Sequence, residues 1–323
     1  MDAQDAAARK ESELFDTELY FTDDLKQSLA SCRLCPKECG VNRLAGETGF
    51  CGAGLQIRAA RAALHHWEEP CLSGTRGSGT VFFSGCNLRC AFCQNAPISR
   101  GQAGAPITIE RLTDIFFELR DQGAHNINLV TPTQYIPQIT AALRAARDRG
   151  LDLPVVCNSG GYENVEALRL WEGLVDIYLP DLKFFSAAVS KKLCGAPDYF
   201  TKASAAIAEM FRQTGKPAFD GDGILTKGVI VRHLMLPGYL FDTRKVLDYL
   251  TRTYGNDIYI SLMNQYTPPS PARPNAPEHP LSPGHYDAMV DFLVDRGQEN
   301  AYVQEPGTDS ESFIPPFDLN GIM

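Results

Sequence analysis

The chain has no apolar segment long enough to cross a membrane. None of its hydrophobic runs reaches the about 18 consecutive apolar residues that mark a transmembrane helix. Its first residues, Met1 to Ala6, also lack the basic and apolar regions of a signal peptide. We therefore expect a cytoplasmic protein without a membrane partner.

Positive charge is scarce as well. The 30 lysine and arginine residues are outnumbered by 39 aspartate and glutamate residues, which gives a formal net charge of −9, and like charges do not gather in long runs. A protein that holds nucleic acid mainly through its phosphates needs the opposite balance. The composition therefore argues against a nucleic-acid partner.

Histidine is too sparse to complete a zinc site around the central cysteines. Cys86, Cys90 and Cys93 form a C-x3-C-x2-C triplet, no fourth cysteine follows at ligand spacing, and the next histidine is His125. A [4Fe–4S] cluster has four irons that each bind a thiolate, so three cysteines leave one iron open for another ligand. An open coordination position is typical of a catalytic metal site. The triplet therefore predicts a catalytic iron–sulfur cluster rather than a structural zinc.

A second group of cysteines precedes the triplet and offers four ligands. Cys32, Cys35, Cys39 and Cys51 lie in a segment rich in glycine. Four thiolates can enclose a zinc that fixes the fold, or a second [4Fe–4S] cluster that relays electrons or tunes a potential. The spacing leaves both open, and our interpretation favours iron–sulfur. The three isolated cysteines are expected to be buried structural thiols: Cys71, Cys157 and Cys194.

From residue 80 onward, strand and helix patterns alternate. Leu112, Ile115, Phe116 and Leu119 repeat with a helical period, and Gly123 ends that helix. Six alternations predict an α/β fold with a parallel sheet and outer helices, although the pattern does not separate a partial barrel from a full one. The other predicted elements are strands at 80–83, 126–130, 154–157, 175–179, 228–234 and 258–262, and helices at 11–30, 135–149, 163–171, 186–193, 199–213, 243–253 and 284–296.

Three regions are expected along the chain. Residues 1–78 form a helix and a cysteine-rich metal-binding extension, which ends in a glycine-rich linker at 73–79. Residues 79–305 form the barrel, and residues 306–323 form a tail. The tail segment 313–318 either closes over an open side of the barrel or packs as an ordinary C-terminus.

The triplet and its surrounding sequence resemble the radical S-adenosylmethionine (radical SAM) superfamily, and the upstream cysteines resemble its PflX-like branch, related to the pyruvate formate-lyase activating enzyme. The resemblance implies a partial (β/α)6 barrel of the TIM type. It also implies a [4Fe–4S] cluster on Cys86, Cys90 and Cys93 whose open iron binds S-adenosylmethionine. Such an oxidoreductase cleaves S-adenosylmethionine to a 5′-deoxyadenosyl radical that abstracts hydrogen.

Polar residues at the ends of the predicted strands are candidates for the cofactor pocket, because such barrels place active sites there. The chain has Thr131-Pro-Thr133 where relatives carry a Gly-Gly-Glu segment, and a helix cap at Thr131 is the alternative. A plain turn would explain the segment 158–162 equally well. Arg232 either meets the carboxylate of S-adenosylmethionine or forms a salt bridge with Asp181. The predicted cofactor-binding residues are Phe92, Thr131, Thr133, Asn158, Ser159, Asp181, Lys183 and Arg232, and one of Asn264, Gln265 and Tyr266 is a further contact.

Asp181-x-Lys183 and the segment from Arg232 to Gly238 are similar to stretches of the glycyl-radical activating enzymes. The leading hypothesis is therefore an enzyme that activates a glycyl-radical enzyme, with a flavodoxin or ferredoxin as electron donor. The alternative is a radical SAM enzyme that modifies a small molecule or a peptide and carries an auxiliary N-terminal cluster. A non-catalytic metal-binding scaffold is disfavoured by the open triplet. His233 is expected to be a core histidine rather than a catalyst.

Overall fold

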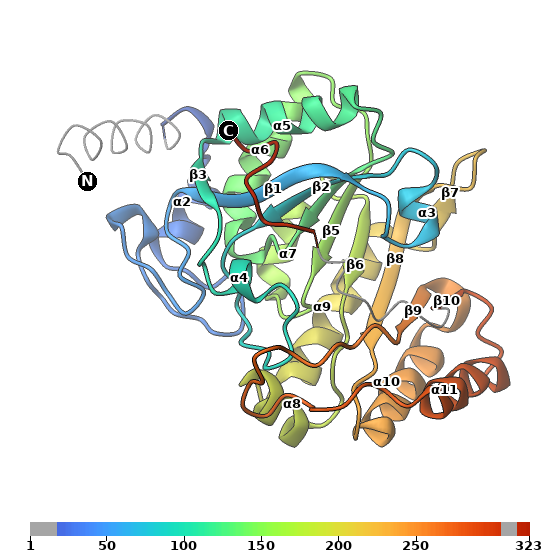
Figure 1. The fold of residues 1–323 in the computed structure, drawn as a ribbon. Helices are drawn as coiled ribbons and strands as arrows, with labels where there is room; N and C mark the ends of the chain where they lie inside the picture. The colour runs from blue at the N-terminus through green and yellow to red at the C-terminus, as the bar shows by residue number, and fades with distance from the viewer. Residues whose placement is uncertain (1–17, 305–314) are drawn as a thin grey trace.

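The protein is built on one sheet of ten strands with helices around its outside (Figure 1). The computed structural model describes residues 18–304 and 315–323. Seven strands run parallel in the spatial order β10-β9-β8-β6-β5-β4-β2, and the two ends of the sheet do not pair with each other, so the barrel is partial, as predicted. Their bounds are β2 Ser78–Phe83, β4 Ile127–Val130, β5 Val155–Ser159, β6 Ile177–Pro180, β8 Leu225–Leu234, β9 Tyr259–Met263 and β10 Ala301–Val303.

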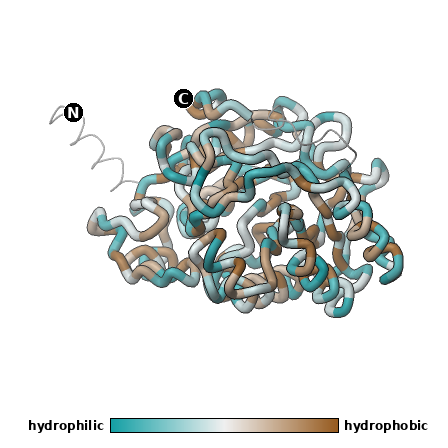
Figure 2. The backbone as a smooth tube through the Cα atoms, turned by 60° about the horizontal axis from the view of Figure 1, so that its bottom comes forward, coloured by the Kyte–Doolittle hydropathy of each residue, from teal (hydrophilic) through white to brown (hydrophobic). Residues whose placement is uncertain are grey.

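Each parallel strand from β2 to β9 is followed by a helical segment, which confirms the predicted six alternations. In α5, the Thr108 side chain caps the helix by accepting from Arg111 N (3.0 Å), and the predicted apolar stripe is buried. In Figure 2 apolar and polar stretches alternate along the elements, as expected where one side of each is buried. The helices are α2 Asp23–Ala30, α3 Pro70–Ser73, α4 Ala96–Ser99, α5 Ile109–Asp121, α6 Ile136–Asp148, α7 Val165–Leu168, α8 Ala187–Cys194, α9 Tyr199–Thr214, α10 Leu240–Thr253 and α11 Pro283–Asp295.

The two faces of the sheet carry different cores, because side chains alternate along a strand. Val155 and Cys157 belong to the main core, which the helices share, whereas Val156 belongs to a smaller cluster on the inner face. That cluster also includes Cys71 and Leu72, which follow β1 and precede β2. The segment before β2 therefore closes the inner face of the barrel at the amino-terminal ends of the parallel strands.

Three antiparallel strands were not predicted. β1 (Ile57–His65) pairs with β2, β3 (Ala105–Ile107) pairs with β1, and β7 (Ala218–Phe219) pairs with β8. The sequence of β1 is rich in alanine and arginine, so it lacks the β-branched residues that favour strands, and pairing with β2 overrides this propensity. The parallel strand β10 was missed as well, because three residues carry too little pattern.

Two predicted boundaries need correction. The helix expected over 11–30 is not continuous, since the chain leaves the helix at Phe21 and α2 starts afresh after Thr22; residues 11–17 lie outside the described part. The linker expected over 73–79 is shorter, because α3 ends at Ser73 and β2 begins at Ser78.

The described part of the C-terminal tail packs along β1. Leu319 N donates to Ala60 O (2.9 Å), and Ala62 N donates to Asn320 O (2.8 Å). The Phe317 ring packs against Phe82 with ring centres 5.7 Å apart. Residues 315–323 therefore form a packed C-terminus; of the segment 313–318, for which closure over an open side was the alternative, residues 313 and 314 lie outside the described residues.

Within the described residues, none of the helices combines the length and the hydrophobicity needed to span a bilayer.

Candidate functional site

The cysteine triplet occupies the loop that follows β2. Leu88 N donates to Cys86 Sγ (3.4 Å), and the Cys93 thiol donates to Ser99 Oγ (3.5 Å). Burial is the main cause that raises the pKa of Cys86 and Cys93, and the neighbouring triplet thiols add to it. Three thiols in one another's field, with polar donors beside them, suit iron, because bound iron neutralises thiolates that burial otherwise disfavours. The residues present therefore fit a cluster held by three cysteines.

A polar network lies beside this loop, at the carboxyl ends of β5 and β6 and within β8. Asp181 accepts from Lys183 Nζ through Oδ2 and from Arg232 Nε through Oδ1 (3.1 Å). Arg232 also donates to Asn158 Oδ1 (2.6 Å). Lys183 is close enough to all three cysteines to lower their pKa values. The structure thus brings four of the predicted cofactor residues together and places the Lys183 cation close to the triplet.

The charges in this network hold one another. Burial would raise the pKa of Asp181, but Lys183 and Arg232 outweigh it and keep that pKa below its usual value. Burial would likewise lower the pKa of Lys183, and the Asp181 carboxylate reverses the shift. All three side chains are therefore charged at neutral pH, although the most exposed of them shows only 20% of its surface.

Arg232 has a further acidic neighbour that sequence reasoning missed. Glu68 Oε2 lies 3.7 Å from the guanidinium, and Asn158 Nδ2 donates to Glu68 Oε1 (3.3 Å). Glu68 enters from the segment between β1 and α3, and burial raises its pKa. The salt bridge with Asp181, one of the two predicted alternatives for Arg232, is present, and a contact of Arg232 with the cofactor stays a prediction. The only sign of Glu68 in the sequence is that it stands in a pair of adjacent glutamates before Pro70.

Other predicted residues are engaged elsewhere in the protein. Thr133 Oγ1 donates to Glu163 Oε1 (2.7 Å), and Ser159 Oγ accepts from Gly161 N (3.3 Å), so neither joins the network around Asp181. The Phe92 ring is buried and packs edge-on against Phe184, with centres 5.9 Å apart. Their predicted roles toward the cofactor therefore have no further support from the geometry.

Thr131 is unusual because its backbone adopts a left-handed conformation, with φ of 58°. A β-branched residue rarely does so, and strain of this kind concentrates at functional sites. Thr131 N donates to Asn158 O (2.8 Å), and Thr131 O accepts from Gln134 Nε2 (2.8 Å). It stands where relatives are expected to carry a glycine, and Gly-Gly-Glu itself is absent.

Two expected structural residues are found as predicted, and one differs. His233 is a satisfied core histidine, with Nδ1 2.7 Å from Leu182 O and Nε2 3.0 Å from Thr243 Oγ1. Cys157 is fully buried. Cys194 is buried as predicted, and its thiol donates to Ser190 O (3.1 Å), but it is not isolated because it lies close to the Cys90 thiol.

The glycines of the segment 158–162 have separate roles, which gives a matched pair of variants. A Cβ on Gly161, whose φ is 73°, would lie 2.2 Å from Asp181 O, whereas one on Gly160 would meet only Leu88 Cδ1 (3.2 Å) and Lys183 Cε (4.0 Å). We expect Gly161→Ala to lower the free energy of unfolding by at least about 2 kcal/mol, and Gly160→Ala by less than about 1 kcal/mol. Denaturant titrations of both variants measure this, and equal losses would contradict it.

Glu163 gives a prediction about pH. Burial raises the pKa of this carboxyl from 4.5 to about 7, and the hydroxyls of Thr133 and Ser159 oppose the shift. Between these two values the folded protein binds more protons than the unfolded chain, so stability falls as pH rises toward 7. We expect Glu163→Gln to be about 1–3 kcal/mol more stable than the parent at pH 8, and the gain to vanish by about pH 4. A constant gain across urea titrations at several pH values would refute this origin.

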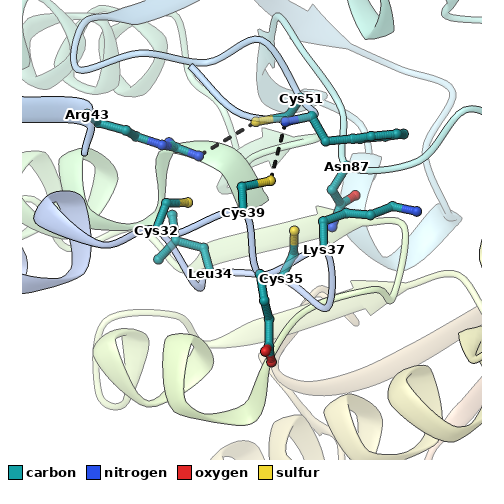
Figure 3. A pocket seen from close by; sticks show the side chains of 10 residues that line it. Cys32, Leu34, Cys35, Lys37, Cys39, Arg43, Cys51 and Asn87 are labelled. Carbon is teal, nitrogen blue, oxygen red and sulfur yellow. Dashed lines mark hydrogen bonds between the residues drawn. The ribbon is translucent and has the colours of Figure 1, made fainter. Parts of the chain in front are cut away.

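The upstream cysteines form a second site, shown in Figure 3. Phe50 N donates to Cys39 Sγ (3.3 Å), and the Arg43 guanidinium donates to Cys51 Sγ (3.6 Å). Burial raises the pKa of Cys35 to about 12. In the described part of the chain, no three histidine, cysteine or acidic side chains are already gathered to hold a single metal ion. The residues that line the cavity of this site are Cys32, Leu34, Cys35, Lys37, Glu38, Cys39, Arg43, Phe50, Cys51 and Asn87.

Comparisons with known proteins agree with this geometry. A family model described as the Radical SAM superfamily matches residues 80–250. An uncharacterized protein of Methanocaldococcus jannaschii, MJ0674, is 31% identical over 260 residues, which make up 76% of this chain and 70% of that protein.

Solved structures match this chain at low identity. Streptococcus suis SuiB bound to S-adenosylmethionine has a TM-score of 0.50 at 14% identity, over 69% of this chain and 49% of that one. The FeFe-hydrogenase maturase HydG from Carboxydothermus hydrogenoformans has a TM-score of 0.49 at 15% identity, over 71% and 54%. The chain thus spans about half the length of these two proteins.

Proposed function

Because the chain belongs to the radical SAM superfamily and is therefore a radical SAM enzyme with a [4Fe–4S] cluster and S-adenosylmethionine, we propose that it activates a glycyl-radical enzyme. When bound, the cluster supplies one electron that splits S-adenosylmethionine into methionine and a 5′-deoxyadenosyl radical. That radical would take a hydrogen atom from a glycine of the partner. The carrying observation is the Asp181–Lys183 pair beside the triplet.

The triplet cysteines and the Asp181–Lys183 pair have distinct tasks in the proposed reaction. Cys86, Cys90 and Cys93 would hold three irons of the cluster. Lys183 carries a positive charge close to them and would attract the carboxylate of S-adenosylmethionine. Asp181 keeps Lys183 charged and fixes its position. The unpaired ends of the sheet leave the barrel open, which suits a partner that must insert a glycine-bearing loop.

The second candidate function is modification of a peptide or a small molecule with the help of an auxiliary cluster. It is favoured by one observation, the four-cysteine site at residues 32–51. For either function we propose that this site binds metal, as iron–sulfur rather than zinc, that the electron donor is a flavodoxin or ferredoxin, and that the protein works in the cytoplasm.

One experiment tests the reaction and a second separates the two candidates. Protein reconstituted anaerobically with iron and sulfide, then given reductant and S-adenosylmethionine, should form 5′-deoxyadenosine; none from a fully loaded cluster would refute both candidates. Incubation with glycyl-radical enzymes of the same organism should then produce a glycyl radical signal by electron paramagnetic resonance. Turnover of a peptide or metabolite without that signal would favour the second candidate.

A further inference from the structure

The four-cysteine site and the triplet share a wall, and Asn87 forms it. Asn87 follows Cys86 directly in the chain and lines the cavity of the four-cysteine site. Cys35 lines the same cavity, and on its other side Asn87 Oδ1 lies 3.9 Å from Cys86 Sγ. Asn87 Nδ2 is fixed by the carbonyl of Tyr162 (2.5 Å). A single buried side chain therefore connects a ligand of one site to a ligand of the other.

Further contacts hold the two loops together. A Cβ on Gly85 would lie 2.8 Å from Cys51 O, so the backbones approach as closely as a glycine permits. Arg89 donates to Phe50 O (2.9 Å), and its guanidinium lies 4.9 Å from the centre of the Phe50 ring. This contact region joins the segment 50–51 to the triplet loop over several residues, so the two loops form one packed unit.

Arg43 and Gln134 extend this connection on the other side. Arg43 donates to Cys51 Sγ (3.6 Å) and to the carbonyl of Gln134. Gln134 Nε2 donates to Ser84 O and Gly85 O, both at 3.1 Å, at the start of the triplet loop. Arg43 is 2% exposed. A buried cation therefore touches a sulfur of the first site and, through Gln134, fixes the loop of the second.

The arrangement of the sulfurs favours a cluster over zinc in the four-cysteine site. A single zinc binds four sulfurs at about 2.3 Å, so they converge on one point, whereas a [4Fe–4S] core is larger and carries its thiolates at separate corners. The four cysteines line one cavity, and among the described residues no three possible ligands already converge on one ion. The triplet, to which the family assigns a cluster, is spread in the same way.

The four-cysteine site is also the more accessible of the two. Cys39 is exposed, and its neighbours Glu38 and Gly40 are exposed as well, whereas the triplet cysteines are half-buried. A donor protein can therefore approach the first site more closely than the second. Electron tunnelling weakens steeply with distance, so a short bonded route behind an exposed entry point is an effective path.

We propose that Cys32, Cys35, Cys39 and Cys51 bind a [4Fe–4S] cluster that receives electrons from a protein donor and passes them through Asn87 and Cys86 to the triplet cluster. One electron leaves the reduced flavodoxin or ferredoxin, which is oxidised by one electron. The N-terminal cluster is reduced and then reoxidised, and S-adenosylmethionine finally accepts that electron. The inference rests on the proposed function, because S-adenosylmethionine cleavage is what consumes the electron.

The first test is the metal content of a variant that lacks the triplet. Cys86→Ala, Cys90→Ala, Cys93→Ala protein, reconstituted anaerobically, should retain about four irons per chain and give a reduced-cluster signal by electron paramagnetic resonance. Zinc without iron would overturn the proposal. If this variant does not fold, the fully reduced parent protein decides: about eight irons and two magnetically interacting clusters are expected, and about four irons with a single isolated signal would overturn it.

The second test measures the route through Asn87. Asn87→Leu keeps all the cysteines and removes the amide that lies between the two sites. We expect the rate of triplet-cluster reduction by reduced flavodoxin, divided by the rate with dithionite, to fall about 10- to 100-fold. Asn164→Leu is the matched control, because the Asn164 side chain donates to Arg33 O (2.9 Å) and Glu38 Oε1 (3.4 Å) in the same segment rather than to a cysteine. This control should keep the parental ratio.

The outcomes separate this inference from the proposed function. Absence of 5′-deoxyadenosine from the loaded parent protein with dithionite refutes the proposed function. If Asn87→Leu protein cleaves S-adenosylmethionine normally with dithionite and its flavodoxin-to-dithionite rate ratio is unchanged, only the electron route is refuted. Equal falls in the ratio for Asn87→Leu and Asn164→Leu also refute it, since general loosening of the segment would then explain both.

Discussion

Cys90→Ala protein should form no 5′-deoxyadenosine above the uncatalysed background, a loss of at least about a millionfold in rate. Cys90 is the middle cysteine of the triplet and lies close to Lys183 and Cys194. Without its thiolate the cluster would have two protein ligands from the triplet, which are too few to leave a single open iron in a stable site. Anaerobic assay with dithionite, together with iron and sulfide analysis, measures the effect.

Two further cysteine variants serve as controls for this result. Cys157→Ala removes a fully buried thiol of β5 in the main core and should cost only stability, about 1 kcal/mol. Cys194→Ala removes the thiol beside Cys90 and tests whether that neighbour is itself a ligand. Since the family motif needs three cysteines, we expect Cys194→Ala to retain its cluster. A fully loaded, active Cys90→Ala protein would contradict the assignment of the triplet.

Asp181→Asn should lower the free energy of unfolding by about 3–5 kcal/mol, because it leaves the two buried cations Lys183 and Arg232 without their shared carboxylate. The amide keeps the shape of the side chain, so the loss reports charge rather than packing. The same variant should bind S-adenosylmethionine more weakly, since Lys183 is no longer held in place. Anaerobic urea titration and equilibrium binding measure the two effects.

Asp248→Asn is the matched control. Asp248 also meets two arginines, Arg252 (3.1 Å) and Arg296, but Arg252 is 69% exposed, so the loss should stay below about 1 kcal/mol. The effect of pH has a definite sign: Asp181 has a lowered pKa, so its contribution is complete above its ordinary pKa and is lost as pH falls through the folded value. Similar losses for Asp181→Asn and Asp248→Asn at neutral pH would contradict a buried charge network.

The triplet and the alternation of strands and helices could be predicted from the sequence because both are local patterns. Three cysteines in eight residues, and apolar repeats of one strand or helix, need no knowledge of distant contacts. The same holds for Asp181 and Lys183, which are two residues apart and so point to the same face of an extended segment. Their position beside the triplet followed from the rule that parallel strands end at a common edge.

The partners of Arg232 could not be predicted in the same way. Glu68 comes from a segment that closes the inner face of the barrel, and its approach depends on β1, whose sequence carries little strand signal. Thr133 and Ser159 are predicted to bind the cofactor because they stand at strand ends. A side chain at a strand end can point to either face of the sheet, however, and the sequence does not say which. Only the folded chain shows that Thr133 donates to Glu163.

The hydrogen bonds between the C-terminal tail and β1 bear on how this molecule behaves at high concentration. β1 pairs with β2 along one side and with β3 only over residues 57–59, so the backbone groups of Ala60 and Ala62 would otherwise face solvent. The backbones of Leu319 and Asn320 satisfy them. An unsatisfied strand edge invites pairing with a strand from another molecule and is a common start of aggregation. The last few residues therefore keep neighbouring copies apart by occupying the place that a foreign strand would take.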